Sequence, residues 1–398
     1  MEEIKRIQLS EIADLITKGT TPTTLGYEFK DEGVNFLKIE CFDENGAFLE
    51  SKVTHISEEC HKKLKRSQLK AGDVLFSIAG AIGRVAIVTE EMIPANTNQA
   101  LAIIRISDEQ VYLPYIKLIL TSPIVIEQFE RKKQGVAQLN LSLKDINEIS
   151  IPLPNKDKQI ELAELFDKVA DIIVKRNMEL TSLDNLIQAR FVELFGDPKL
   201  NDKGWNAGII SDYYEVKGGK RIPKGMGYAD DVTAHPYLRA TDMKNETILD
   251  DDIHYIDEEV YEHIKRYTVK SGDIYLTNVG VNLGMAGVIP KKYDGANLTE
   301  NAVKLVPKTE KVIDGVFLAH YINSPGIQDY INERKMSVGV PKLAIFRIET
   351  MPLLLPPLDI QMQFIEFHKQ VNKLKVEIQK SLDETQILFD SLMQKYFG

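Results

Sequence analysis

The sequence predicts a mixed α+β or α/β fold in which one globular domain occurs twice, each copy followed by a long helix. Two observations lead to this prediction. Motifs from the first half of the chain return in the same order in the second half, and each half ends in an apolar pattern with the seven-residue period of a coiled coil. The predicted segments are residues 1–153 and 197–354 for the two domains, and residues 154–196 and 355–398 for the two helices.

The internal repeat is the strongest of these signals. Residues 70–76 (KAGDVLF) return as residues 270–276 (KSGDIYL), an offset of 200 residues. Further along, Ser122-Pro123 returns as Ser324-Pro325, an offset of 202 residues, and small insertions explain the drift. The chain is therefore predicted to be a duplication with its boundary after Gly196.

The first part of each copy has the pattern of a compact domain of short strands. Gly72-Asp73 and Gly272-Asp273 predict structural turns that lead into buried strands. Ser57 and Asp257 stand where the N-caps of short helices are expected. The predicted strands are Val74–Ile78, Val85–Val88 and Ala100–Ile106 in the first copy, with Met285–Ile289 and Ala302–Val306 as counterparts in the second.

The second part of each copy is predicted to be one long helix. A helix from Asp157 to Phe195 would be about 58 Å long at 1.5 Å per residue. Because neither helix can bury its apolar stripe alone, we expect the two to pair antiparallel about a pseudo-two-fold axis. The predicted seam residues are Leu162, Phe166, Val169, Ile173, Leu180, Leu183, Ile187, Leu194, Phe364, Val371, Ile378, Leu382, Phe389 and Leu392. Polar residues on the same grid, which set the register or contact something else, are Arg176, Arg190, His368, Lys375 and Thr385.

The composition limits the classes of function. The chain has 398 residues, 43% of them hydrophobic, which is enough for sizeable cores. The two cysteines, Cys41 and Cys60, offer neither a disulfide framework nor a zinc ligand set, so we expect a reducing, cytoplasmic location. We expect no membrane span. The net charge of −10 argues weakly against a nucleic-acid partner, although DNA responds to a local basic surface rather than to the total charge.

Several segments, taken in this order and duplicated, resemble a known family. They are residues 18–23 (KGTTPT), the two Gly-Asp-strand motifs, residues 135–143, and residues 353–361 (LLLPPLDIQ) at the start of the second helix. Over nearly its whole length the chain resembles the specificity subunits of type I restriction–modification enzymes. The resemblance implies two target recognition domains that each read half of a split double-stranded DNA target. It also implies that the helices dock two methyltransferase subunits, with restriction subunits as further partners where the system restricts.

The same resemblance implies a chain with no catalytic site and no cofactor of its own. S-adenosylmethionine, and ATP with Mg²⁺ if a nuclease subunit is present, would belong to the partner subunits. The residues agree with this expectation, because the sequence has no G-x-x-x-x-G-K-[ST], H-E-x-x-H or paired C-x-x-C motif. We therefore predict no catalytic residues and no metal site.

The candidate DNA-binding residues are polar or basic and lie in predicted loops. Residues 18–23 could place hydroxyl and N–H groups on phosphates, and residues 217–224 could do so with basic side chains; the alternative is a polar turn held by Gly and Pro. Amides near residues 98 and 301 could read adenine, or could satisfy the backbone at a strand start. The candidates are Lys18, Thr20, Thr21, Thr23, Asn98, Gln99, Gln138, Lys217, Lys220, Arg221, Lys224, Asn301 and Lys342.

Three further functions remain as alternatives. A stand-alone bipartite DNA-binding regulator would bind DNA tightly without any partner. A hydrolase with an unrecognised active site would show turnover as the purified chain. A purely structural coiled-coil scaffold would not need two elaborate globular domains.

Overall fold

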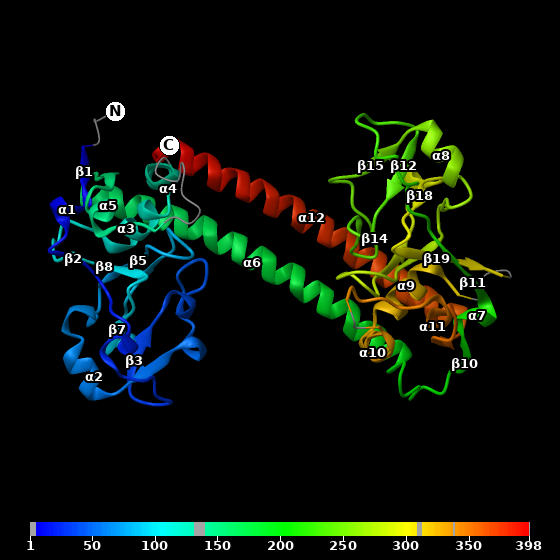
Figure 1. Cartoon of the computed structure of the whole chain (residues 1–398), viewed down its shortest axis with the longest axis horizontal. Coiled ribbons are helices and arrows are strands. Elements are labelled where there is room, and N and C mark those ends of the chain that lie inside the picture. Colours follow the sequence, from blue (N-terminus) through cyan, green and yellow to red (C-terminus); the bar gives the residue numbers. More distant parts are fainter. Residues whose placement is uncertain (1–4, 131–139, 309–312, 337–338, 398) are drawn as a thin grey trace. The chain divides into compact units, whose positions relative to one another are not determined.

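The computed structural model describes residues 5–130, 140–308, 313–336 and 339–397, and its helices and strands follow the same order in both halves (Figure 1). The chain divides into two compact units. Unit 1 consists of residues 1–178 and 379–398, and unit 2 consists of residues 179–378. This division differs from the four predicted segments, because each long helix contributes residues to both units.

Unit 1 is built on two small sheets. The first is antiparallel, in the order β2 (Leu15–Lys18), β8 (Leu101–Arg105), β5 (Val74–Ser77), β6 (Val85–Ile87). The second has the order β4 (Thr54–Ile56), β3 (Val34–Leu37), β7 (Ala95–Thr97), with β3 parallel to β7, and β1 (Arg6–Gln8) pairs separately with β9 (Ser150–Pro152). The short helices are α1 (Leu9–Ile12), α2 (Glu58–Lys63), α3 (Leu113–Leu120), α4 (Pro123–Glu130) and α5 (Leu143–Asn147).

Unit 2 repeats this topology. Its sheets are β11 (Tyr214–Gly218), β19 (Ala302–Pro307), β16 (Ile274–Thr277), β17 (Ala286–Val288); β15 (His254–Ile256), β12 (His235–Leu238), β18 (Asn297–Leu298); and the pair β10 (Asn206–Ile209), β20 (Pro352–Leu355). A hairpin of β13 (Met243–Lys244) and β14 (Thr247–Ile248) is added. The helices are α7 (Ile210–Tyr213), α8 (Glu258–Ile264), α9 (Gly315–Asn323), α10 (Pro325–Arg334) and α11 (Ile345–Glu349). The predicted duplication and the mixed fold class are confirmed.

The β5 segment is apolar because both faces of this strand are buried. All four of its residues are buried, with Val74 in one hydrophobic core and Leu75 in another, on the two faces of the sheet. The preceding Gly72 adopts φ +88°, and the Asp73 carboxylate accepts a hydrogen bond from the Lys70 N–H at 2.8 Å. Arg105 adds an ion pair to Asp73 at 2.7 Å, so this Gly-Asp motif is structural, as predicted.

The predicted N-caps have different outcomes. The Ser57 hydroxyl accepts a hydrogen bond from the Cys60 N–H at 3.2 Å and caps α2, as predicted. Asp257 occupies the N-cap position of α8 but makes no side-chain cap hydrogen bond. The helical segments end at Lys63 and Ile264, before the basic pairs Lys65-Arg66 and Lys265-Arg266.

The two long helices, α6 (Lys156–Phe195) and α12 (Leu358–Phe397), have 40 residues each and are confirmed. In unit 1, Lys158 lies over the ring of Tyr396 at 5.7 Å, and the rings of Phe166 and Phe389 are 5.3 Å apart. The partners run in opposite directions along the chain, so the helices pair antiparallel there. In unit 2, contacts join Phe191 to Phe364 and Asp184 to Lys375, which is again an antiparallel pairing.

Burial along the helices follows the seven-residue grid. Every grid position, polar ones included, is buried or half-buried. Between residues 171 and 186 of α6, the only side chains that are not exposed are Ile173, Arg176, Leu180 and Leu183. Off the grid, Phe191 and Phe195 are also buried in the unit 2 core, and Met393 and Phe397 in the unit 1 core, because the helix ends pack on the domains.

One buried glutamine fixes the start of each long helix. Gln159 accepts a hydrogen bond from the Tyr112 N–H at 2.8 Å and donates one to the Pro154 carbonyl at 2.8 Å. In the second copy, Gln361 accepts from the Asp314 N–H at 2.9 Å and donates to the carbonyl of a proline five residues before it at 2.8 Å. The proline-rich runs before the helices therefore attach each helix to its own domain.

Candidate nucleic-acid interface

The structure brings two of the predicted loop segments of unit 1 together. A Cβ atom at Gly19 would lie 2.1 Å from the Thr97 carbonyl oxygen, so this close approach requires glycine. The next residue, Thr20, donates its N–H to the same carbonyl at 3.1 Å. The hydroxyl of Thr21 donates a hydrogen bond to the Gln99 side-chain oxygen. Residues 18–21 and 97–99 thus lie side by side, and we name them loop pair 1.

The side chains of loop pair 1 differ in their exposure. Lys18, Thr23 and Gln99 are exposed, whereas Thr20 and Thr21 are half-buried. Asn98 is half-buried as well, and its side-chain oxygen accepts the Ala100 N–H at 3.1 Å. The Asn98 amide therefore satisfies the backbone at a strand start, which leaves Gln99 as the amide that faces solvent.

Unit 2 uses the same backbone arrangement with different side chains. A Cβ atom at Gly219 would lie 2.0 Å from the Thr299 carbonyl oxygen, and Lys220 donates its N–H to the Leu298 carbonyl at 2.8 Å. Arg221 forms an ion pair with Glu300 at 2.5 Å, and this hydrogen-bonded carboxylate raises the pKa of the arginine. We name residues 217–221 and 299–301 loop pair 2.

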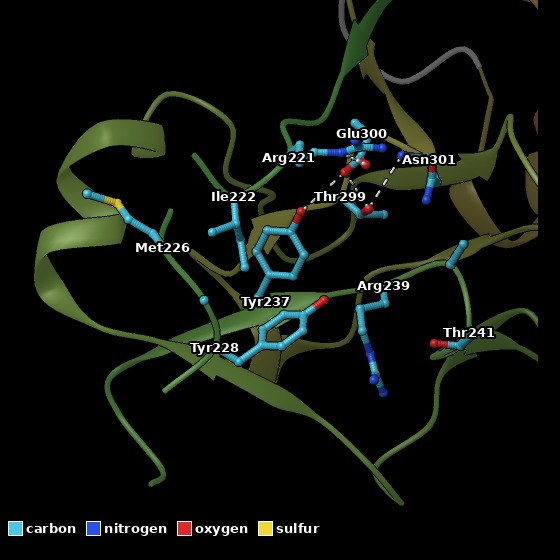
Figure 2. A pocket seen from close by; sticks show the side chains of 12 residues that line it. Arg221, Ile222, Met226, Tyr228, Tyr237, Arg239, Thr241, Thr299, Glu300 and Asn301 are labelled. Carbon is cyan, nitrogen blue, oxygen red and sulfur yellow. Dashed lines mark hydrogen bonds and ion pairs between the residues drawn. The ribbon is translucent and has the colours of Figure 1, made fainter. Parts of the chain in front are cut away.

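Loop pair 2 borders a pocket of about 510 Å³, shown in Figure 2. The exposed ring of Tyr228 packs edge-on against the ring of Tyr237 at 5.8 Å, and the Tyr237 hydroxyl donates to the Lys220 carbonyl at 2.8 Å. Asn301 and Arg239 complete the polar lining. Aromatic faces, an amide and a guanidinium in one hollow are the groups that recognise bases and phosphates.

Arg239 is held in a fixed position at this pocket. Its guanidinium forms ion pairs with Asp242 at 2.7 Å and Asp252 at 2.9 Å. The hydrogen bond to Asp242 is the main cause that raises the pKa of Arg239, and burial opposes it. The group is therefore a pre-organised donor rather than a free cation.

Most of the remaining candidates belong to unit 2. Lys217 pairs with Glu215 at 2.8 Å, and Lys220 lies over the ring of Tyr267 at 5.8 Å. Lys224 is exposed. Lys342 is also exposed, and its backbone pairs with Met336 and Val279, away from the lining of the pocket. Gln138 lies outside the described residues.

Sequence reasoning missed Tyr228, Tyr237 and Arg239. No local motif marks them, because Tyr228 before β12, Tyr237 within β12 and Arg239 just after it meet at the pocket only in the folded unit. The one signal that could have found them was the repeat itself. Lys38 follows Leu37 in β3 as Arg239 follows Leu238 in β12, so a cation recurs at one place in both copies.

Comparison with known proteins decides the family. The model of the family described as "Type I restriction modification DNA specificity domain" matches residues 1–182 and again residues 202–386. The chain belongs to this family. The two matches also agree with the internal duplication, and the resemblance inferred from the motifs is confirmed.

Individual members of the family share limited sequence identity with this chain. The chain is 32% identical over 193 residues to the type I restriction enzyme EcoBI specificity subunit of Escherichia coli. That match spans 47% of this chain and only 40% of the relative. A chain from the structure titled "Structural basis underlying complex assembly and conformational transition of the type I R-M system" matches 99% of this chain and 97% of its own length, with a TM-score of 0.64 and 16% identity. The S subunit of M. genitalium matches 100% of this chain and 97% of its own length, with a TM-score of 0.55 and 14% identity. At 16% and 14% identity, these two structural matches show a shared fold alone.

Within the part of the chain that the structure describes, no helix combines the length and the apolarity that crossing a membrane requires.

Proposed function

We propose that this chain is the non-catalytic subunit that supplies DNA sequence specificity in a type I restriction–modification system. Each unit reads one half of a split double-stranded target. The observation that carries the proposal is the pair of equivalent loop surfaces, loop pair 1 and loop pair 2, built on one backbone design with different exposed side chains. A shared backbone with different side chains suits two readers of two different half-sites.

The side chains divide into two kinds of contact. Lys18, Lys220 and Lys224 are exposed cations that suit phosphate oxygens, and Gln99 and Asn301 carry amides that suit an adenine edge. These local groups give the chain a DNA-binding surface in spite of its net charge of −10.

The helices supply candidate docking surfaces for partner subunits. Three exposed apolar positions of α6 recur in α12 at an offset of 202 residues. The pairs are Ile172 and Leu374 (45% and 50% exposed), Val174 and Val376 (45% and 69%), and Leu186 and Leu388 (47% and 50%). Apolar side chains left exposed at equivalent places on two repeats suit protein contacts, and two equivalent sets suit two copies of one partner. We therefore propose two methyltransferase subunits per chain, each bringing S-adenosylmethionine.

The proposal extends to the rest of the assembly. Where restriction subunits join, ATP and Mg²⁺ belong to those subunits, and the complex works in the cytoplasm. The chain itself is proposed to hold no catalytic group.

Co-purification from the native host tests this function. We expect the tagged chain to bring down a DNA methyltransferase in a two-to-one ratio, and the complex to methylate a target with an unread gap. Tight, sequence-specific DNA binding by the chain alone, with no methyltransferase recovered, would instead support the stand-alone regulator. Turnover of a substrate by the purified chain would support the hydrolase.

A further inference from the structure

Unit 2 contains a cluster of one carboxylate and two imidazoles that the proposed function does not use. His320 Nδ1 lies 2.9 Å from Glu246 Oε1, and His368 Nε2 lies 3.5 Å from Glu246 Oε2. One nitrogen or oxygen from each of the three residues lies within 4.8 Å of the others. The side chains are only 12%, 14% and 22% exposed for His320, His368 and Glu246 respectively.

The three residues come from three separate elements. Glu246 lies in the two-residue turn of the β13–β14 hairpin, His320 in α9 and His368 in α12. The imidazole of His320 also packs against the rings of Phe191 at 4.9 Å and Phe364 at 5.0 Å. The cluster therefore joins the recognition domain of unit 2 to its long helices, in a largely apolar surrounding.

Glu246 adopts a backbone conformation that favours glycine. Asn245 and Glu246 have φ +53° and +59°, as a two-residue hairpin turn of this type requires. At the equivalent turn of the first copy the sequence is Asn45-Gly46, and Gly46 has φ +76°. A glutamate at this position is disfavoured by the backbone, so its side chain must supply the compensation.

The first copy shows that the fold itself does not need polar groups here. The repeat places Leu118 and Phe166 at the positions of His320 and His368, at the offset of 202 residues. Phe166 is buried in the hydrophobic core of unit 1, and Leu118 packs against that core. All three positions change together, from a glycine and two apolar residues to a carboxylate and two imidazoles, which is the pattern of one shared ligand.

The carboxylate is oriented but incompletely satisfied. Asn323 donates a hydrogen bond to Glu246 Oε1 at 3.1 Å, and its own side-chain oxygen accepts the Ala286 N–H at 2.9 Å. The other oxygen, Oε2, is buried and accepts no hydrogen bond; His368 Nε2 lies 3.5 Å from it without forming one. A buried carboxylate oxygen left unsatisfied beside two imidazoles is a position that a metal ion can fill.

We propose that Glu246, His320 and His368 bind one Zn²⁺ ion, with water as the fourth ligand. Two imidazoles and one carboxylate form an established ligand set for Zn²⁺. Tetrahedral bonds of about 2.0–2.1 Å place the ligand atoms about 3.3 Å apart, close to the two distances of 2.9 and 3.5 Å found here. Asn323 serves as the outer partner that orients the carboxylate.

The ion would act as a cross-link inside unit 2. It would fix the hairpin of the recognition domain to α9 and α12, at a place where unit 1 relies on apolar packing. This role does not depend on the DNA-binding function, so the two proposals can fail separately.

Zinc titration of the full chain tests the site. After the metal is removed with a chelator, we expect isothermal titration calorimetry to show one equivalent of Zn²⁺ bound per chain. Co²⁺ in its place should give the visible absorption of a tetrahedral site. Saturation at about 100 times the dissociation constant should raise the melting temperature of unit 2 by about 5–10 °C.

The matched variants take their residues from the first copy. Glu246→Gly suits the positive φ, and His368→Phe restores the residue found in unit 1, so both should fold without metal. Each should weaken Zn²⁺ binding by more than about 100-fold, because loss of an outer partner alone costs 10–100-fold. The control is His235→Gln, which removes a half-buried histidine that lies outside the cluster and pairs with Glu258 at 2.7 Å, and it should leave zinc binding unchanged. Absence of binding to the wild-type chain at micromolar Zn²⁺, or equal binding by Glu246→Gly, would overturn the proposal.

Discussion

Two glycines set the character of the candidate interface at the residue level. Gly19 and Gly219 each allow a loop to lie against carbonyl oxygens at the end of an equivalent strand, that of Thr97 in unit 1 and those of Leu298 and Thr299 in unit 2, at distances no side chain would permit. The backbone is therefore fixed, while the exposed side chains around it are free to differ. The hydrogen bond between Thr21 and Gln99 in unit 1 is replaced by the ion pair between Arg221 and Glu300 in unit 2.

The exposed lysines of unit 2 give a prediction about DNA affinity. The double variant Lys220→Ala with Lys224→Ala should weaken binding about equally for all sequences, because phosphate contacts carry no base information. The slope of log affinity against log salt should fall by about 0.9 for each phosphate that no longer binds a lysine. Fluorescence anisotropy of the assembled complex at several salt concentrations measures both quantities. Lys203→Ala, which changes an exposed lysine of the segment before β10, is the control, and an unchanged slope in the double variant would contradict the assignment.

The buried glutamine at the start of α6 gives a prediction about stability. Gln159→Leu leaves the Tyr112 N–H and the carbonyls of Gln110 and Pro154 without their partner. Since an unsatisfied buried group costs about 1–3 kcal/mol, the free energy of unfolding of unit 1 should fall by about 3 kcal/mol or more. Thermal unfolding followed by circular dichroism measures the loss. Gln188→Leu, at an exposed position of the same helix, should change stability by less than about 0.5 kcal/mol, and an equal effect of the two variants would contradict the anchoring role.

At the scale of elements, the seven-residue period predicted which side chains of the long helices are shielded from solvent. The grid from Leu162 to Leu392 selected the less exposed side chains of both long helices, because a helix shows one face to its partner. The grid did not include Phe191 and Phe397. They are buried because the helix ends pack against a domain as well as a helix and so bury a wider face. The sequence pattern did not predict the cluster around Glu246, because His320 lies 74 residues away from it in the sequence.

The shared pattern of the two helices predicts the behaviour of a half-chain. A fragment of residues 1–196 lacks Met393 and Phe397, which are buried in the core of unit 1. A second fragment can supply Phe191 and Phe195 at the equivalent positions, because these residues occupy the same places in the repeat. Burial of such side chains is worth roughly 1.5–3 kcal/mol each before entropy is subtracted, so we expect a folded homodimer.

Sedimentation of this fragment is the measurement. A dimer at micromolar concentration is the predicted result, and with methyltransferase present its target should be palindromic. A folded fragment that stays monomeric would show that the helices do not pair through this stripe.

In the proposed function, the whole molecule combines two readers that share a topology and differ in their surfaces. The family model matches both halves, and the strand order of the sheets is the same in both units. The duplication was readable from the sequence because the Gly-Asp turns and the glutamine anchors are structural and therefore recur. The pocket beside Tyr228 was not readable, because residues that contact a target differ between two readers and leave no repeated motif. This division between common framework and individual surface leads to the central claim that each unit reads its own half-site.

A domain exchange tests this claim most directly. Residues 1–153, which carry both β1 and its partner β9, would be replaced by the corresponding domain of another specificity subunit, with both long helices retained. The methylated sequences would then be read by sequencing that detects modified bases. We predict that one half of the split target changes while the other half and the gap length stay the same. A change in both halves, or in neither, would contradict the account.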